Sequence, residues 1–307
     1  MGDQNVVLGI DAGGTKIGIG LVTKEGEILA SVRYPHRNRG SREWVRELKE
    51  QIYGLLEKNK RKELTAIGVG IRGHVDFRRQ RLIYSTVLEL APGFDLRGEL
   101  EHEFGCPVFL DNDVKAAACG EQIFGAGKRY RSFVCYNVGT GIAAAAVEDG
   151  RLLRGKGNTA GEIGCDLLPG SRGEPLLLEK NASGWGIGRK AAGCLEDPLL
   201  ANGWNAEKAV RAWKEGDEQA KKAVWEAAGL LAVSVVNMDH LLAPEAFVFV
   251  GGVVSEPQFF GLLREQIQKT SERTGKRWET AVEVSALGAG RAGMLGAAGV
   301  AFCQITG

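Results

Sequence analysis

The chain repeats one pattern of strands and turns in its two halves. Residues 6–30 and residues 133–153 can be laid side by side, because each run contains an apolar strand, a turn of glycine and threonine, a second apolar strand, an acidic turn and a third strand. Alternating apolar residues, as in KIGIGLV at residues 16–22, predict strands. The repeat therefore predicts two halves of common architecture, and a ligand cleft is expected between them.

Beyond the repeat, hydrophobic periodicity predicts further helices and strands. Helices are expected at residues 42–58, 96–104, 114–124, 206–242, 259–273 and 289–304, and strands at residues 64–71, 107–110 and 247–250. The last of these helices is rich in alanine and could pack back on the first half of the chain.

Two well-known phosphate-binding motifs do not fit the glycine-rich turns. A dinucleotide fingerprint and a P-loop both place their glycines at the start of a helix, whereas a predicted strand follows Gly13 and Gly14. The stretch GRLLRGKG at residues 150–157 approaches a P-loop, but Gly157 stands where the hydroxyl that binds Mg²⁺ should be. We interpret that stretch as part of a hairpin.

A hairpin turn can itself bind phosphate through its backbone N–H groups. Thr15 and Lys16 are then available to phosphate oxygens, and Asp11 is placed to hold Mg²⁺ through water. The alternative is that the two glycines before them only permit a positive φ in a tight turn. The first turn alone leaves both interpretations open, and the second turn, GTG at residues 139–141, favours the phosphate site.

A run of polar residues, DND, lies between an apolar strand and an alanine-rich helix. One residue of Asp111, Asn112 and Asp113 is expected to cap that helix. Phosphoryl transfer to an alcohol needs a carboxylate near the accepting hydroxyl. Asp113 suits that task, and Asn112 can exchange hydrogen bonds with neighbouring hydroxyls.

Two glutamates are further candidates in the second half. Glu162 lies in the glycine-rich stretch AGEIG, and Glu179 follows the apolar run PLLL. The commoner fate of a glutamate is to be solvated at the surface, so this alternative stays open for both residues.

Composition excludes several classes of protein. A chain of 307 residues suits two domains, and 39 basic against 38 acidic residues give a net charge of +1, without a global field for nucleic acid or an anionic membrane. The chain opens without a basic leader, and its most apolar helical stretch, residues 227–236, is too short to span a bilayer. We expect a cytoplasmic protein.

The six cysteines are scattered singly and form no C-x-x-C pair. They are Cys106, Cys119, Cys135, Cys165, Cys194 and Cys303. In a reducing compartment we expect free thiols rather than disulfides. No histidine stands at ligand spacing from them, so a zinc site built from cysteine and histidine is not indicated.

Taken in order, the motifs resemble those of the ROK family (repressor, open reading frame, kinase) of sugar kinases. They are DAGGTK, DND, VGTGI, GxxxxAGEIG, LExxASG and a late GG, and they cover nearly the whole chain. The resemblance implies an α/β chain with the two-domain actin-like ATPase fold, which is ribonuclease H-like. Each domain is then a mixed sheet flanked by helices, with the ATP and sugar cleft between the domains.

The resemblance also implies domain limits and an assembly. The expected N-terminal domain covers residues 1–116 and is joined by a C-terminal helix at residues 290–307, and the nucleotide-side domain covers residues 117–289. Dimers are common in the family, so a homodimer is expected.

The activity that the resemblance implies is phosphoryl transfer from ATP to a sugar hydroxyl, usually the 6-hydroxyl of a hexose or an N-acetylhexosamine. Asp113 matches the catalytic base, Asn112 a sugar ligand, and Asp11 the aspartate associated with Mg²⁺. The other positions that match sugar ligands are Gly73, His74, Thr86, Glu162 and Glu179. The positions that match the nucleotide loops are Gly13, Gly14, Thr15, Lys16, Gly139, Thr140, Gly141, Gly251 and Gly252.

The chain departs from the family pattern in one loop. Many members have a histidine that ends GEIGH, followed by a C-x-C-G-x-x-G-C-x-E segment, and together these bind a structural zinc. Here Cys165 stands at the histidine position, and PGSRGEPLLLE contains no cysteine. We therefore expect no zinc, with the loop held by packing of Leu176, Leu177 and Leu178.

Two other functions compete with a standard sugar kinase. One is a non-catalytic protein that senses a sugar or a nucleotide, suggested by the altered loop at Cys165. The other is a kinase for a non-standard acceptor, because a fold alone does not fix the substrate. Few residues precede DAGGTK, which disfavours a repressor with an N-terminal helix-turn-helix domain.

Overall fold

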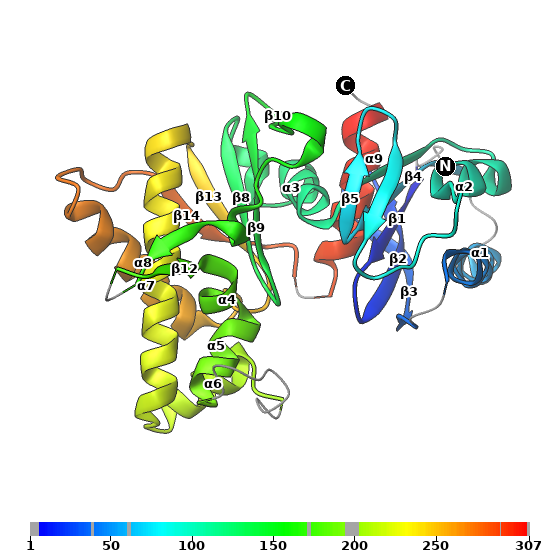
Figure 1. Cartoon of the computed structure of the whole chain (residues 1–307). Coiled ribbons are helices and arrows are strands. Elements are labelled where there is room, and N and C mark those ends of the chain that lie inside the picture. The colour runs from blue at the N-terminus through cyan, green and yellow to red at the C-terminus, as the bar shows by residue number, and fades with distance from the viewer. Residues whose placement is uncertain are drawn as a thin grey trace. The chain divides into compact units, whose positions relative to one another are not determined.

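The structure is a computed structural model, and it describes residues 6–37, 40–59, 63–170, 173–193, 203–288 and 290–305. The chain is an α/β protein with two mixed sheets, each flanked by helices (Figure 1). Contacts divide it into two compact units. The first contains Met1–Tyr130, Gly150–Ala160 and Ala286–Gly307, and the second contains Arg131–Asp149 and Gly161–Ser285.

The sheet of the first unit has the strand order β3-β2-β1-β4-β7. Its strands are β1 (Val6–Ala12), β2 (Lys16–Thr23), β3 (Ile28–Pro35), β4 (Leu64–Ile71) and β7 (Val108–Asn112). The first three form an antiparallel meander, and β1, β4 and β7 run parallel. The register aligns Asp11 with Gly70 and Gly70 with Asp111, so these residues share one edge of the sheet.

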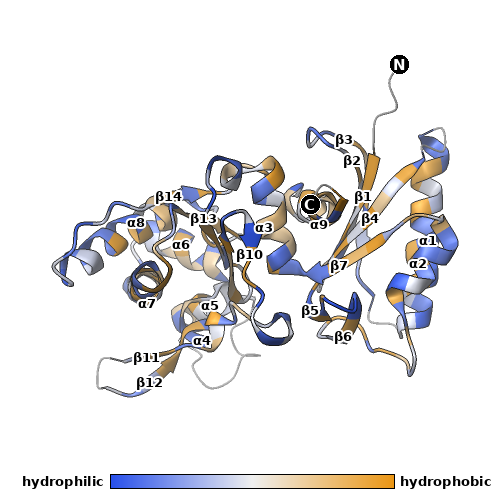
Figure 2. Ribbon diagram, turned by 90° about the horizontal axis from the view of Figure 1, so that it is seen from above, coloured by the Kyte–Doolittle hydropathy of each residue, from blue (hydrophilic) through white to orange (hydrophobic). Residues whose placement is uncertain are grey.

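Helices cover both faces of this sheet (Figure 2). On one face, α1 (Ser41–Lys58) and α2 (Leu96–Phe104) pack on the strands through a stripe that includes Trp44, Leu48 and Leu100. On the other face lie α3 (Asp113–Phe124) and α9 (Ala292–Ile305). The apolar periodicity of residues 42–58 thus predicted both the helix and its buried face correctly.

The helix α9 packs very closely on the first sheet because glycines face it. A Cβ atom on Gly9 would lie 2.2 Å from the carbonyl oxygen of Met294, and one on Gly68 would lie 1.9 Å from that of Ala297. This helix therefore belongs to the first unit. The expected helix start at residue 289, and residues 306 and 307, lie outside the described residues.

The sheet of the second unit is built from β8 (Phe133–Val138), β9 (Ile142–Glu148), β13 (Ala246–Val250) and β14 (Ala281–Val284). Among these four strands the order is β9-β8-β13-β14, in which β8 and β9 are antiparallel and the other neighbours are parallel. Its helices are α4 (Leu178–Ala182), α5 (Gly184–Ala191), α6 (Ala206–Lys214), α7 (Glu218–Leu242) and α8 (Pro257–Glu272). The second glycine-threonine turn joins β8 to β9, as the repeat predicted.

Smaller elements complete the chain. They are the hairpin of β5 (Gly73–Asp76) and β6 (Arg81–Ser85), the short strand β10 (Arg151–Leu152), the hairpin of β11 (Leu167–Pro169) and β12 (Pro175–Leu177), and 3-10 turns at Ala126–Arg129, Lys156–Asn158 and Ile163–Cys165. The expected domain boundary between residues 116 and 117 falls within α3, and that division remains a prediction. None of the helices in the described part of the chain is both long and apolar enough to cross a membrane.

Five of the six cysteines lie in the described residues, and each is a free thiol. Cys106, Cys119 and Cys135 are buried, Cys303 is half-buried and Cys165 is exposed. The sixth, Cys194, lies outside the described residues.

Candidate active site

The polar residues of the first unit gather at the carboxyl ends of its three parallel strands. Asp11 is the penultimate residue of β1, and Asp111 and Asn112 end β7, with Gly70 of β4 between Asp11 and Asp111 in register. Ligands of open α/β sheets bind outside this edge, where the strands end and loops diverge. The first unit therefore presents its carboxylates where a substrate would be bound.

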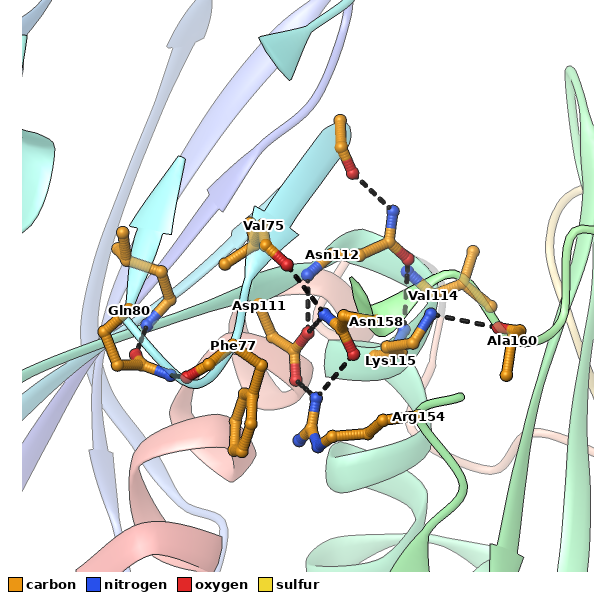
Figure 3. Close-up of polar contacts among 12 residues, drawn as sticks. Val75, Phe77, Gln80, Asp111, Asn112, Val114, Lys115, Arg154, Asn158 and Ala160 are labelled. Atoms are coloured by element: carbon orange, nitrogen blue, oxygen red, sulfur yellow. Dashed lines mark hydrogen bonds and ion pairs between the residues drawn. The ribbon is translucent and has the colours of Figure 1, made fainter. Parts of the chain in front are cut away.

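Asn112 caps the helix that carries Asp113. Its Oδ1 accepts hydrogen bonds from the N–H groups of Val114, at 3.0 Å, and Lys115, at 3.4 Å, and its Nδ2 donates to the carbonyl oxygen of Gly73 at 3.1 Å (Figure 3). The prediction that one residue of DND caps the helix is confirmed. A second Nδ2 hydrogen remains for a ligand, so the role of Asn112 as a sugar ligand stays a prediction.

Asp113 is the first residue of α3, and its charge affects the pKa of Asp11. The pKa of the Asp11 carboxyl is raised to about 6, chiefly by burial and also by the nearby Asp113 carboxylate, while Arg33 acts in the opposite direction. The Asp11 carboxylate is packed against the backbone of α9, because a Cβ on Gly293 would lie 2.0 Å from its Oδ2. Two carboxylates are therefore held close together at this edge of the sheet.

The backbone conformation of the first glycine turn, at residues 13–16, does not require glycine. Neither Gly13 nor Gly14 has a positive φ, so the purely conformational interpretation is wrong. The Gly13 N–H donates to the Lys16 carbonyl oxygen at 3.2 Å, and a Cβ on Gly14 would meet only ordinary contacts, the nearest being Val87 at 3.4 Å. Thr15 and Lys16 are exposed. A side chain at position 14 would therefore occupy space outside the turn rather than space inside the protein.

The predicted sugar-side residues Gly73, His74 and Thr86 lie in and after the β5–β6 hairpin. Gly73 has φ +155, and a Cβ there would lie 2.2 Å from the carbonyl oxygen of Tyr84, so only glycine fits. Nε2 of His74 lies 2.5 Å from the carbonyl oxygen of Gly157. Thr86 is exposed. The structure thus brings Gly73 to Asn112, while His74 is engaged with the backbone of the segment that follows β10.

In the second unit, two predicted nucleotide turns follow neighbouring parallel strands. Val250 of β13 is in register with Asn137 of β8, so the turns at residues 139–141 and 251–252 lie side by side. Gly251 has φ +107, and a Cβ on it would lie 2.4 Å from the Val138 carbonyl oxygen. No atom lies within 4 Å of a Cβ built on Gly252. Gly251 is required by the backbone, whereas Gly252 leaves open space beside the turn.

Glu179 is tied to the second turn rather than merely solvated. Its Oε2 accepts a hydrogen bond at 2.8 Å from the N–H of Ile142, the first residue of β9. A Cβ on Gly164 would lie 3.1 Å from the same oxygen, so the Ile163–Cys165 turn lies beside it. Glu162 and Cys165, at the two ends of this turn, are both exposed.

The loop that lacks cysteines continues from this turn. Leu178 is fully buried in the core of the second unit, whereas Leu176 and Leu177 are half-buried in β12, which pairs with β11. Of the three leucines expected to hold the loop, Leu178 contributes most of the apolar burial.

Sequence reasoning missed the residues that surround DND. Asp111 is fully buried and forms an ion pair with Arg154, whose Nη1 lies 2.7 Å from its Oδ2. Lys115 is also buried, and its Nζ donates to the carbonyl oxygen of Ala160 at 3.1 Å. Arg154 stands in GRLLRGKG, the stretch that we interpreted as part of a hairpin rather than as a P-loop. Its spacing from DND carried no signal, because the contact joins residues more than forty positions apart.

The carboxylate pair of the first unit fits Mg²⁺. A divalent cation would relieve the repulsion between Asp11 and Asp113, and Mg²⁺ is usually held by one or two carboxylates together with substrate phosphates. Within the described residues, no three side chains of the His, Cys, Asp and Glu types gather as an all-protein metal site would require. Asp11 would thus hold the ion through water, together with a phosphate ligand.

Comparison with known proteins identifies the family. The model of the ROK family matches residues 7–302. The chain belongs to the ROK family. A glucokinase of Streptomyces coelicolor is 31% identical over 331 residues, which cover 97% of this chain and 98% of that protein.

Solved structures agree with this assignment. The ROK hexokinase from Thermus thermophilus superposes with a TM-score of 0.81 at 30% identity, covering 98% of this chain and 99% of that one. A ROK glucokinase from Streptomyces griseus, determined in complex with glucose and AMPPNP, gives a TM-score of 0.76 at 28% identity over 96% of this chain and 98% of that one. This ROK chain therefore has the actin-like ATPase fold and is a sugar kinase, which binds ATP and acts on a sugar.

Proposed function

We propose that this ROK kinase transfers the γ-phosphoryl group of ATP to the 6-hydroxyl of a hexose or an N-acetylhexosamine, with Asp113 as the general base. The observation that carries the proposal is the pair of carboxylates at the edge of the first sheet. Asp113 begins α3 there, close enough to Asp11 to raise its pKa. A carboxylate base beside a second carboxylate suited to a cation is an arrangement that serves phosphoryl transfer to an alcohol.

The remaining residues have separate tasks in this proposal. Asn112 would orient the sugar through its free Nδ2 hydrogen, with Gly73, His74 and Thr86 beside it in the first unit. Glu162 and Glu179 would accept hydrogen bonds from further sugar hydroxyls. Glu179 already holds the first residue of β9, so it would link the sugar to the second glycine-threonine turn.

The glycine turns would bind the nucleotide. Gly13, Gly14, Thr15 and Lys16 would receive phosphate oxygens in the first unit, and the backbone N–H groups of Gly139, Thr140 and Gly141 would do so in the second. Gly251 and Gly252 would lie against the adenosine. The open space beside Gly252 and the merely ordinary contacts at Gly14 support this part of the proposal, because the protein itself does not restrict either position. Mg²⁺, when bound near Asp11, would neutralise charge on the phosphates.

The acceptor sugar is best tested with a panel. Glucose is the first candidate, because the Streptomyces coelicolor relative is a glucokinase and the Streptomyces griseus structure holds glucose. Fructose, mannose, allose, N-acetylglucosamine and N-acetylmannosamine complete the set. A coupled ADP-release assay measures turnover with each, and phosphorus NMR of the product identifies the phosphorylated hydroxyl. Phosphorylation at any hydroxyl other than the sixth would contradict that part of the proposal.

The role of Asp113 is tested by the variant Asp113→Asn. The substitution keeps the shape of the side chain and the acceptor for the Val114 N–H, but removes the base. We expect kcat to fall by roughly 10²- to 10⁴-fold, while calorimetry shows unchanged affinity for AMPPNP. Asp149→Asn is the matched control, because Asp149 is exposed and pairs only with Arg131 at the surface. Turnover by Asp113→Asn equal to that of the control would exclude Asp113 as the base.

We further propose that the enzyme is a homodimer, since dimers are common in the family that it belongs to. Light scattering after size exclusion measures the mass directly. A mass equal to that of one 32.9 kDa chain across the concentrations used in the assay would contradict the proposal.

A further inference from the structure

Asp111 cannot serve as a substrate ligand, because it is fully buried beneath the edge of the sheet. Both of its carboxylate oxygens are engaged within the protein (Figure 3). Oδ1 accepts from the N–H of Asn112 and from Nδ2 of Asn158, both at 2.9 Å, and Oδ2 accepts from Nη1 of Arg154 at 2.7 Å. A buried carboxylate is retained only where its partners compensate for lost hydration.

Arg154 and Asn158 come from one short segment of the chain, Gly150–Ala160, which belongs to the first unit. Nη1 of Arg154 also donates to Oδ1 of Asn158 at 2.9 Å, and its guanidinium lies 3.2 Å from the ring centroid of Phe77. Asn158 has φ +66, and its Nδ2 donates to the Val75 carbonyl oxygen at 3.1 Å as well as to Asp111. The left-handed backbone of Asn158 is therefore held by three side-chain hydrogen bonds.

A second buried charge holds the same segment from the other side of Asp113. Lys115 is only 2% exposed, and its Nζ donates to the carbonyl oxygen of Ala160 at 3.1 Å. Asp111 and Lys115 thus flank Asp113 by two residues in each direction, and both bind the segment Gly150–Ala160. His74 adds a third contact through the carbonyl oxygen of Gly157.

We propose that Asp111 and Arg154, with Asn158, are positioning residues of the phosphoryl transfer. They fix the junction of β7 and α3 on the segment Gly150–Ala160, and so they hold Asn112 and Asp113 in the orientation that the reaction needs. This inference rests on the proposed role of Asp113. The coupling is direct, because Oδ1 of Asp111 binds the N–H of Asn112, whose own side chain caps α3 and binds Gly73.

The energetic reason is that general-base catalysis depends steeply on geometry. A displacement of the base by about 1 Å costs on the order of 100-fold in rate. Without Arg154, the Asp111 carboxylate would be left buried and uncompensated. The junction of β7 and α3 would then shift so that water reaches the Asp111 carboxylate, and the N-terminus of α3 would move with it.

The test uses the full-length enzyme and the variant Arg154→Met, which keeps apolar contact with Phe77 but removes the guanidinium. We expect kcat for glucose, or for whichever panel sugar gives the fastest turnover, to fall roughly 10- to 100-fold. The KM for ATP and the affinity for AMPPNP should stay within about threefold of wild type, because the nucleotide residues are untouched. Arg131→Met is the matched control, since Arg131 pairs with Asp149 at 3.0 Å on the exposed surface.

Two further measurements separate positioning from stability. Hydrogen exchange of residues 112–116 should become faster by roughly tenfold or more in Arg154→Met, as local opening becomes easier, and should not change in Arg131→Met. The double variant Asp111→Asn/Arg154→Met restores charge balance. We expect it to regain the melting temperature that Arg154→Met loses. We expect kcat to stay low, because the hydrogen bond from Arg154 to Asn158 is still missing. The double variant also replaces Arg154→Met if that protein does not fold.

Several results would overturn the inference. One is a kcat for Arg154→Met within twofold of the Arg131→Met control, together with unchanged exchange at residues 112–116. Another is recovery of kcat along with stability in the double variant, which would mean that the ion pair only balances charge. If wild-type enzyme phosphorylates no sugar in the panel, the proposed function fails, yet the exchange measurement still decides whether Arg154 fixes the junction.

Discussion

At the scale of single residues, Asp11 illustrates how a position that we propose for function opposes stability. Its carboxyl is mostly buried and lies near a second carboxylate, and its pKa is raised to about 6. In the unfolded chain the same group has an ordinary pKa near 3.8. Between these two values the folded state binds more protons than the unfolded state, so the contribution of Asp11 to stability falls as the pH rises through this window.

The variant Asp11→Asn should therefore be more stable than wild type at neutral pH. We expect a gain of roughly 1–3 kcal/mol in the free energy of unfolding at pH 7.5, measured by urea denaturation with EDTA present. The gain should shrink toward zero near pH 4, where Asp11 is protonated in both states. Sugar-dependent turnover should be lost in the same variant. A variant that is less stable than wild type at pH 7.5 would show that Asp11 is not electrostatically strained.

Cys165 is the residue by which this chain departs from its family, and its exposure makes it testable. The other described cysteines are buried or half-buried, and burial raises the pKa of the Cys106 thiol to about 11. At pH 7.5 we expect N-ethylmaleimide to modify Cys165 before the other described cysteines, as peptide mass spectrometry would show. Because Cys165 closes the turn that begins at Glu162, a bound acceptor sugar should slow the reaction. Cys165→Ser is the control, and labelling unaffected by a saturating sugar would place that turn away from the sugar.

The residues that could be predicted are those whose chemistry is local in sequence. A helix cap within DND followed from its place between a strand and a helix, and the capping bonds assign that role to Asn112. Arg154 could not be predicted, because its importance depends on a contact with Asp111 that only the folded chain creates. The burial of Lys115 could not be predicted for a related reason. A lysine in a helix is normally solvated, and nothing in DNDVKAA indicates that this one is buried.

At the scale of elements, the first unit depends on the close approach of α9 to β4. Gly68→Ala would bring a methyl group to within 1.9 Å of the Ala297 carbonyl oxygen, where neither backbone can move freely. We expect a loss of at least about 3 kcal/mol in the free energy of unfolding. Gly54→Ala is the control, since Gly54 lies inside α1 and a Cβ there meets no atom within 4 Å. The control should gain roughly 0.5–1 kcal/mol, and equal stability of the two variants would contradict close packing at Gly68.

Elements with a strong period could be predicted, and short polar ones could not. The strands of the repeat, together with α1, α3 and β13, were all expected, because their apolar residues recur at the spacing of one secondary structure. The β5–β6 hairpin was missed. Its short strands show no regular apolar alternation, and the hairpin is held by glycine at position 73, by the Asn112 amide and by Asn158 at the Val75 carbonyl oxygen. Strand β14 is four residues long and nowhere fully buried, so its sequence shows little pattern.

At the scale of the whole molecule, the two units do not correspond to two continuous halves of the sequence. The repeat correctly indicated two halves, but the first unit takes residues 150–160 from within the second half and residues 286–307 from the end of the chain. The exchange of residues 150–160 leaves no mark in composition, because it is decided by contacts with distant residues. The segment Gly150–Ala160 belongs to the first unit because it contacts Asp111 and Lys115. The terminal helix belongs there because it packs on the glycines of β1 and β4.

This interleaving predicts an unequal effect of truncation. A chain that ends at Ser285 lacks α9, so one face of β1 and β4 would be exposed and the packing partner of α3 would be missing. The second unit keeps all of the strands β8, β9, β13 and β14. We expect hydrogen exchange in β1 and β4 to become fast while amides of β8 and β13 stay protected. A peptide of residues 286–307 added in trans should restore protection in β1 and β4, whereas a scrambled peptide should not. Full protection of β1 and β4 in the truncated chain would show that the first unit folds without its terminal helix.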